Sequence, residues 1–116
     1  MEERIERTAL KHLIHTEQYA RKVLPFLKEE YFSDRLEKLI FREIALFYEK
    51  YNAQPTNETL AIELNGRKDI NDSEFQNITS TIATFQQEEI NLDWLISTTE
   101  KFCKDRAIHN AIMDGI

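Results

Sequence analysis

The sequence contains little glycine and little proline, which limits both its fold and its chemistry. Only two glycines and two prolines occur among its 116 residues. Loops that hold phosphates need closely spaced glycines, and the G-x-x-x-x-G-K-[ST] pattern is missing. The G-x-S-x-G and H-E-x-x-H signatures of hydrolytic enzymes are missing as well. We therefore expect no catalytic residue and no cofactor site in this chain, and nucleotide hydrolysis by the chain alone is close to excluded.

Cysteine and long apolar runs are also scarce. Cys103 is the only cysteine, which excludes an internal disulfide and a multi-cysteine zinc site. His12 and His15 could share a metal, but no third ligand has a suitable spacing, so we interpret both as solvated or capping side chains.

No run approaches the roughly 18 apolar residues of a membrane span, and the glutamate-rich start is no secretory signal. A cytoplasmic protein without a membrane partner is expected.

The net charge of −6 is unevenly distributed along the chain. Residues 1–50 carry ten basic and ten acidic side chains, whereas residues 51–116 carry five basic and eleven acidic ones. An acidic surface gains nothing from the release of phosphate counterions. The composition therefore argues against direct nucleic-acid binding and favours a protein partner with a basic surface.

Long runs of alternating apolar and polar residues are missing, so the sequence predicts an all-α fold. The strongest helix is expected from Asp34 to Tyr51, where a wide apolar stripe indicates a central helix covered on several sides. Ser33 is its expected N-cap, with Asp34 and Glu37 in the first turn, where negative charge suits the helix dipole. An apolar loop over 26–32 should lie against the core. The other expected N-caps are Thr16, Thr56 and Asn91. A further helix is expected to open at Asp72 or Ser73.

The last predicted helix, over 92–116, has more apolar surface than a terminal helix needs. One stripe is formed by Leu92, Leu95, Ile96, Phe102, Cys103 and Met113, and Trp94, Ile108 and Ile112 lie roughly opposite. Lys101 and Asp105 form either a solvated pair or a charged rim. A single buried face would suffice on a monomer, so the second face predicts another partner. We accordingly divide the chain into a compact multi-helix head, 1–91, and a long C-terminal helix, 92–116.

A recognisable order of short segments runs along the chain. Between Asp34 and Leu64 it includes Leu39-Ile40-Phe41, Ile44, Leu46-Phe47-Tyr48, Pro55-Thr56, Thr59-Leu60-Ala61 and Leu64. Further segments are His12-Leu13-Ile14, Glu30-Tyr31-Phe32, Trp94-Leu95, Thr99-Glu100-Lys101, Arg106-Ala107 and Asn110-Ala111. In this order and spacing the chain resembles, over nearly its whole length, the N-terminal domain of replicative DNA helicases of the DnaB family, with those of the T4-like tailed phages as the closest likeness.

The resemblance implies a part of a longer protein. In the family a helical head leads into a hairpin of two long helices, and a linker then leads to a RecA-like motor that uses ATP and Mg²⁺. Helix 92–116 matches the first arm of that hairpin. Paired hairpins form a collar on a hexameric ring, and the collar receives primase. The candidate interface residues are Leu92, Trp94, Leu95, Ile96, Thr99, Phe102, Cys103, Arg106, Ile108, Asn110, Ile112 and Met113.

Two other readings remain open at this stage. A self-standing helical adaptor, such as a regulator or anti-repressor, would have the same absence of catalytic motifs. A DNA-binding helix-turn-helix protein ranks third, because the helix after Thr56 carries Glu58 and Glu63 and no basic residue. The helicase reading predicts that the reading frame continues past Ile116 into a G-x-x-x-x-G-K-[ST] sequence, whereas the adaptor reading predicts a stop codon.

Overall fold

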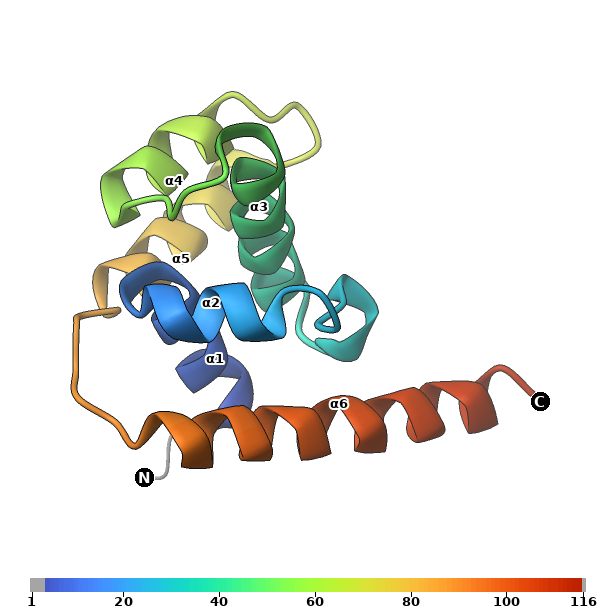
Figure 1. The fold of residues 1–116 in the computed structure, drawn as a ribbon. Coiled ribbons are helices and arrows are strands. Elements are labelled where there is room, and N and C mark those ends of the chain that lie inside the picture. Colours follow the sequence, from blue (N-terminus) through green and yellow to red (C-terminus); the bar gives the residue numbers. More distant parts are fainter. Residues whose placement is uncertain (1–3, 116) are drawn as a thin grey trace.

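The computed structural model describes residues 4–115, and over this range the chain is all α-helical (Figure 1). This confirms the predicted fold class. The elements are α1 (Ile5–His15), α2 (Glu17–Val23), a short 3-10 turn η1 (Glu29–Tyr31), α3 (Arg35–Tyr51), α4 (Asn57–Asn65), α5 (Asp72–Ala83) and α6 (Leu92–Met113). Ile116, the predicted end of the last helix, lies outside the described residues. No helix within this range is long and apolar enough to cross a membrane.

Two of the predicted N-caps are confirmed by their hydrogen bonds. The Thr56 hydroxyl accepts from the Thr59 amide at 3.0 Å, and the Asn91 side chain accepts from the Trp94 amide at 2.9 Å. Each bond satisfies one of the backbone N–H groups that a helix start leaves without a partner. The start of α6 is therefore determined by a local signal in the sequence.

The predicted cap of α3 needs correction, whereas α5 begins at Asp72, one of its two predicted starts. The N-cap of α3 is Asp34 rather than Ser33, because the Asp34 carboxylate accepts from the Leu36 amide at 2.8 Å. The N-cap of α5 is Asn71, which forms a reciprocal capping box with Glu74. α3 thus begins one position later than predicted, after a neighbouring residue whose side chain also caps well.

Thr16 stands at the N-cap position of α2, as predicted, but its hydroxyl does not cap the helix. It instead lies 2.7 Å from His12 Nδ1. His12 is fully buried, so the prediction of a solvated or capping histidine is wrong for this residue. A buried imidazole needs hydrogen-bond partners, and this need takes precedence over the cap.

One hydrophobic core joins all six α-helices of the described range. Phe32, from the predicted apolar loop, is fully buried, and its ring stacks on Phe41 with 5.2 Å between the ring centroids. On α3 the core residues end at Ile44, whereas Leu46 and Tyr51 are exposed. The prediction that α3 is covered on several sides therefore holds for its first half only.

Two buried carboxylates connect α3 to distant parts of the chain. Glu37 is fully buried and accepts from Arg4 and Arg7, and Glu43 accepts two hydrogen bonds from Arg67 at 3.0 and 2.7 Å. Glu37 lies in the first turn of α3, as predicted, and the structure adds that its side chain is fully buried. Buried carboxylates require such charged partners, because burial without them is costly.

Candidate protein interface

The inner face of α6 completes the core of the head, which we define as residues 4–91. Leu95 and Thr99 are fully buried, and Cys103 is nearly so. The Thr99 hydroxyl donates to the Leu95 carbonyl oxygen at 2.8 Å, so the Tyr19 hydroxyl, 2.7 Å from Thr99 Oγ1, is the donor in their shared bond. The other inward residues are partly buried against the same core: Leu92, Ile96 and Phe102. These six interface candidates therefore pack within the chain itself.

Two further candidates fasten the second half of α6 to the 3-10 turn. Arg106 Nε donates to the carbonyl oxygen of Tyr31 at 3.0 Å, and Asn110 Nδ2 donates to the carbonyl oxygen of Glu30 at 3.0 Å. Both bonds end on the backbone of η1, one helical turn apart on α6. Arg106 and Asn110 therefore orient α6 on the head.

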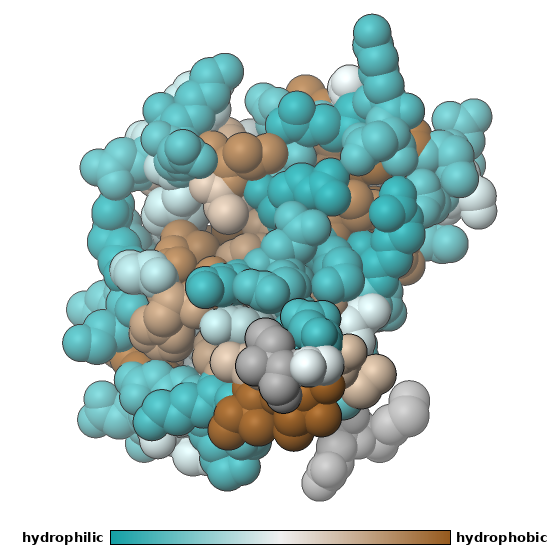
Figure 2. All heavy atoms as spheres, turned by 90° about the vertical axis from the view of Figure 1, so that its right-hand side faces the viewer, coloured by the Kyte–Doolittle hydropathy of each residue, from teal (hydrophilic) through white to brown (hydrophobic). Residues whose placement is uncertain are grey.

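The end of α6 is different, because it extends past the head (Figure 1). Ile108, Ile112 and Met113 are 61%, 68% and 72% exposed, and we call these three residues the tip patch. Figure 2 looks onto this end of the molecule and shows strongly hydrophobic side chains low on the face. The helix ends at its C-cap Asp114, followed by Gly115 with φ of 79°. Nothing in the described part of the chain covers the tip patch.

The structure corrects two details of the predicted apolar stripes. Met113 does not join Leu92 and the other core-facing residues, because the head ends before the helix reaches it. Trp94 is exposed but is separated from Ile108 by the exposed Lys101 and Asp105, which form an ion pair at 2.9 Å. The outer face of α6 is thus a polar strip with the tip patch at one end and a lone tryptophan at the other.

Sequence reasoning missed an apolar groove beside α6. Its volume is about 380 Å³, and Phe26, Tyr31, Cys103 and Ala107 line it. Burial raises the pKa of the Cys103 thiol to about 11, and the nearby carboxylate of Glu100 adds to the shift. The thiol is therefore kept neutral, as expected of a core residue rather than a reactive one. The groove could not be found from helical periodicity, because its two sides lie about 75 residues apart in the sequence.

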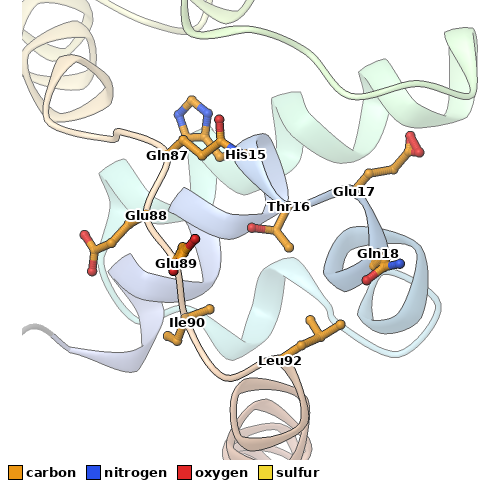
Figure 3. A pocket seen from close by; sticks show the side chains of 9 residues that line it. All are labelled: His15, Thr16, Glu17, Gln18, Gln87, Glu88, Glu89, Ile90 and Leu92. Carbon is orange, nitrogen blue, oxygen red and sulfur yellow. The ribbon is translucent and has the colours of Figure 1, made fainter.

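A second, more polar cleft of about 490 Å³ lies between the α1–α2 corner and the connection to α6 (Figure 3). Ile90 and Leu92 form its apolar part, and Glu17 and Glu89 lie on different sides of it. Its carboxylates are not all free, because Glu88 pairs with Lys11 at 3.2 Å. We therefore regard this cleft as a feature of the acidic surface rather than as a catalytic site.

The two histidines of α1 do not come together. His12 is in the core, whereas His15 Nε2 lies 3.1 Å from the carbonyl oxygen of Phe85, just after the end of α5. Residues 4–115 contain no group of three or more histidine, cysteine or acidic side chains that could hold a metal ion.

The described residues thus form an all-α protein with an exposed apolar surface, the tip patch, at the end of α6. The chain is similar to the DnaB-like replicative helicase of Enterobacteria phage T4, with 28% identity over 102 residues. This similarity covers 88% of the chain and 21% of the helicase, so the chain spans about a fifth of that protein's length. No family model matches the chain.

Proposed function

We propose that this chain is the N-terminal assembly and primase-docking domain of a bacteriophage replicative DNA helicase. In the intact protein the domain would precede a motor that unwinds duplex DNA using ATP and Mg²⁺. The observation that carries this proposal is the tip patch on a helix that extends past its own head. The similarity to the T4 helicase over 88% of the chain supports the choice of protein class.

The tip patch has the properties of a surface that another helix covers. Ile108 and Ile112 are four residues apart and therefore lie on the same side of α6, one turn apart. Burying a side chain of this size stabilises a complex by about 1.5–3 kcal/mol. An isolated chain gains none of this, because nothing in its described residues packs on them. Contact with a neighbouring subunit would supply the missing cover.

The orientation of α6 supports an assembly role as well. Leu95, Thr99 and Cys103 hold the first half of the helix in the core, and Arg106 and Asn110 hold the second half against η1. These contacts fix the orientation of α6 on the head, and with it the position of the tip patch. Such preorganisation lowers the entropic cost of association.

Sedimentation velocity of the 116-residue chain tests the assembly role. We expect species heavier than a monomer that increase with concentration in the micromolar range, and loss of these species in Ile108→Glu. Ile62→Glu is the matched control, because Ile62 on α4 is similarly exposed, at 65%, but lies outside the tip patch. A wild-type chain that stays monomeric throughout, or equal effects of the two variants, would argue against assembly through the tip.

Primase docking is tested separately with the primase encoded by the same genome. We propose that the acidic surface attracts it, and Glu89 and Glu100 are exposed, whereas Glu88 already pairs with Lys11. The double variant Glu89→Lys, Glu100→Lys should weaken binding measured by calorimetry, and the wild-type affinity should fall as salt is raised. Unchanged binding in this variant would contradict the role of these two residues, and no binding by the wild-type chain would contradict primase docking. Glu58→Lys on α4 is the control for net charge.

A further inference from the structure

The cleft beside the α1–α2 corner combines apolar surface with negative charge (Figure 3). Ile90 and Leu92 form its apolar part, and both are partly buried against the core. Glu17 and Glu89 are exposed and lie on different sides of this apolar part. None of the described residues that line the cleft is lysine or arginine. The lining therefore presents an acidic edge around an apolar surface.

The two walls of the cleft are fastened to each other. The His15 Nε2 atom lies 3.1 Å from the carbonyl oxygen of Phe85, and Lys11 pairs with Glu88 at 3.2 Å. These two contacts hold the connection to α6 against α1, and the N-cap hydrogen bond of Asn91 fixes the point where the connection enters α6. The cleft is thus formed before any partner binds, which lowers the entropic cost of binding.

Two of the carboxylates that line the cleft are available to a partner. Glu89 forms no ion pair within residues 4–115. Glu17 lies 3.8 Å from Arg21 Nε, which is a long contact between exposed side chains, and the guanidinium of Arg21 also donates to Asn52. Exposed pairs of this kind contribute little to stability. A cation from a partner can therefore compete for Glu17 and can bind Glu89 directly.

A basic side chain with a long aliphatic stem matches these properties. The stem of arginine or lysine packs on apolar surface while the charged head stays at the edge. Arginine fits better, because its planar guanidinium carries five N–H donors and is more weakly hydrated than an ammonium group. A purely apolar side chain would bring the carboxylates out of water without a partner, which is costly. A phosphate group would be repelled.

We propose that this cleft receives an arginine side chain of the primase. Its stem would pack on Ile90 and Leu92, and its guanidinium would bind the carboxylate of Glu17 or Glu89. This inference rests on the proposed docking role and adds the surface and the residue type that are recognised. Direct contacts of this kind act mainly on the dissociation rate, whereas general attraction by an acidic surface acts mainly on the association rate.

Surface plasmon resonance with immobilised primase from the same genome separates these two effects. Glu17→Gln and Glu89→Gln each keep the size of the side chain and should raise the dissociation rate about two- to fivefold. Glu58→Gln on α4 removes the same charge outside the cleft and should leave the dissociation rate unchanged. If all three variants dissociate as the wild type does, the cleft is not the receptor, although primase docking stands. If the wild-type chain does not bind primase, the docking role itself fails.

The preference for arginine can be tested without primase. Nuclear magnetic resonance of the 116-residue chain is recorded with N-acetyl-arginine amide and with the matched citrulline compound, which has the same length but no charge. The arginine compound should shift the amide signals of residues 15–18 and 87–92 more than the citrulline compound does, and Glu89→Gln should reduce the difference. Equal effects of the two compounds on these signals, or larger shifts elsewhere in the chain, would overturn the inference.

Discussion

The Tyr19 hydroxyl donates a hydrogen bond to Thr99 Oγ1 across 2.7 Å and so joins α2 to α6 inside the core. The Thr99 hydroxyl in turn donates a hydrogen bond to the Leu95 carbonyl oxygen. Both residues are fully buried, and burial raises the pKa of Tyr19 well above its ordinary value. The position of α6 on the head thus depends on a polar contact as well as on apolar packing.

Tyr19→Phe should lower the free energy of unfolding by about 0.5–1.5 kcal/mol, because it removes this bond but keeps the ring. Urea denaturation followed by circular dichroism measures the change. Tyr51→Phe is the control, because Tyr51 is half exposed and its hydroxyl forms no hydrogen bond with residues 4–115; this variant should change stability little. Equal stability of Tyr19→Phe and the wild type would show that the buried bond contributes nothing.

The free energy of unfolding should fall at alkaline pH, because the Cys103 thiol and the Tyr19 hydroxyl hold their protons more tightly in the folded chain than in the unfolded one. Burial raises the pKa of Cys103 from 9.0 to about 11, and it raises the pKa of Tyr19 from 10.0. A raised pKa of this kind contributes stability that is complete below the unfolded value and is lost as the pH rises toward the folded one. The free energy of unfolding should therefore decrease from pH 9 upward. Cys103→Ala should show a shallower decrease between pH 9 and 11, and an identical slope would contradict this assignment.

Glu37→Gln should destabilise the chain by about 1–3 kcal/mol, because it replaces charged hydrogen bonds from Arg4 and Arg7 with weaker ones at a buried site. Thermal or urea denaturation gives the value. Asp105→Asn is the comparison, since it disrupts the exposed pair with Lys101 and should cost less than about 0.5 kcal/mol. Equal effects of the two substitutions would mean that the burial of Glu37 does not strengthen its contacts.

Arg106→Ala should loosen the second half of α6 without unfolding the head. The amides of residues 104–113 should exchange with deuterium several-fold faster, while those near Leu95 and Thr99 keep their protection, because the buried contacts of the first half remain. Lys101→Ala, on the exposed side of the helix, is the control. Faster exchange throughout the head would show that Arg106 supports the whole fold rather than the orientation of α6.

Most helices of this chain could be predicted because their signals are local. The spacing of apolar residues and the capping side chains at Thr56 and Asn91 act within one or two turns. The start of α3 was misplaced by one residue, because Ser33 and Asp34 are both good caps and their order does not reveal which one reaches the backbone amide. The side chain of Thr16 does not cap α2 as predicted, because its hydroxyl forms a hydrogen bond with the buried His12 instead.

The candidate site could be predicted only in part, because its geometry depends on contacts between distant segments. Helical periodicity identified two faces on α6, but it could not show that the head ends before Met113. Nor could it show that Arg106 bonds to Tyr31, 75 residues away. The exposed end of α3 was missed for the same reason, since an apolar stripe indicates that a helix is buried but not how far its neighbours extend.

The length of the native polypeptide that carries this sequence tests the central claim most directly. The native protein can be captured from the cells that produce it with an antibody raised against the 116-residue chain. Peptide mass spectrometry of the captured protein then gives its length. The account predicts a protein about five times as long as this chain, by analogy with the 21% of the T4 helicase that the chain matches, with a G-x-x-x-x-G-K-[ST] peptide after Ile116. A native protein of 13.8 kDa would contradict it and would favour a self-standing helical adaptor.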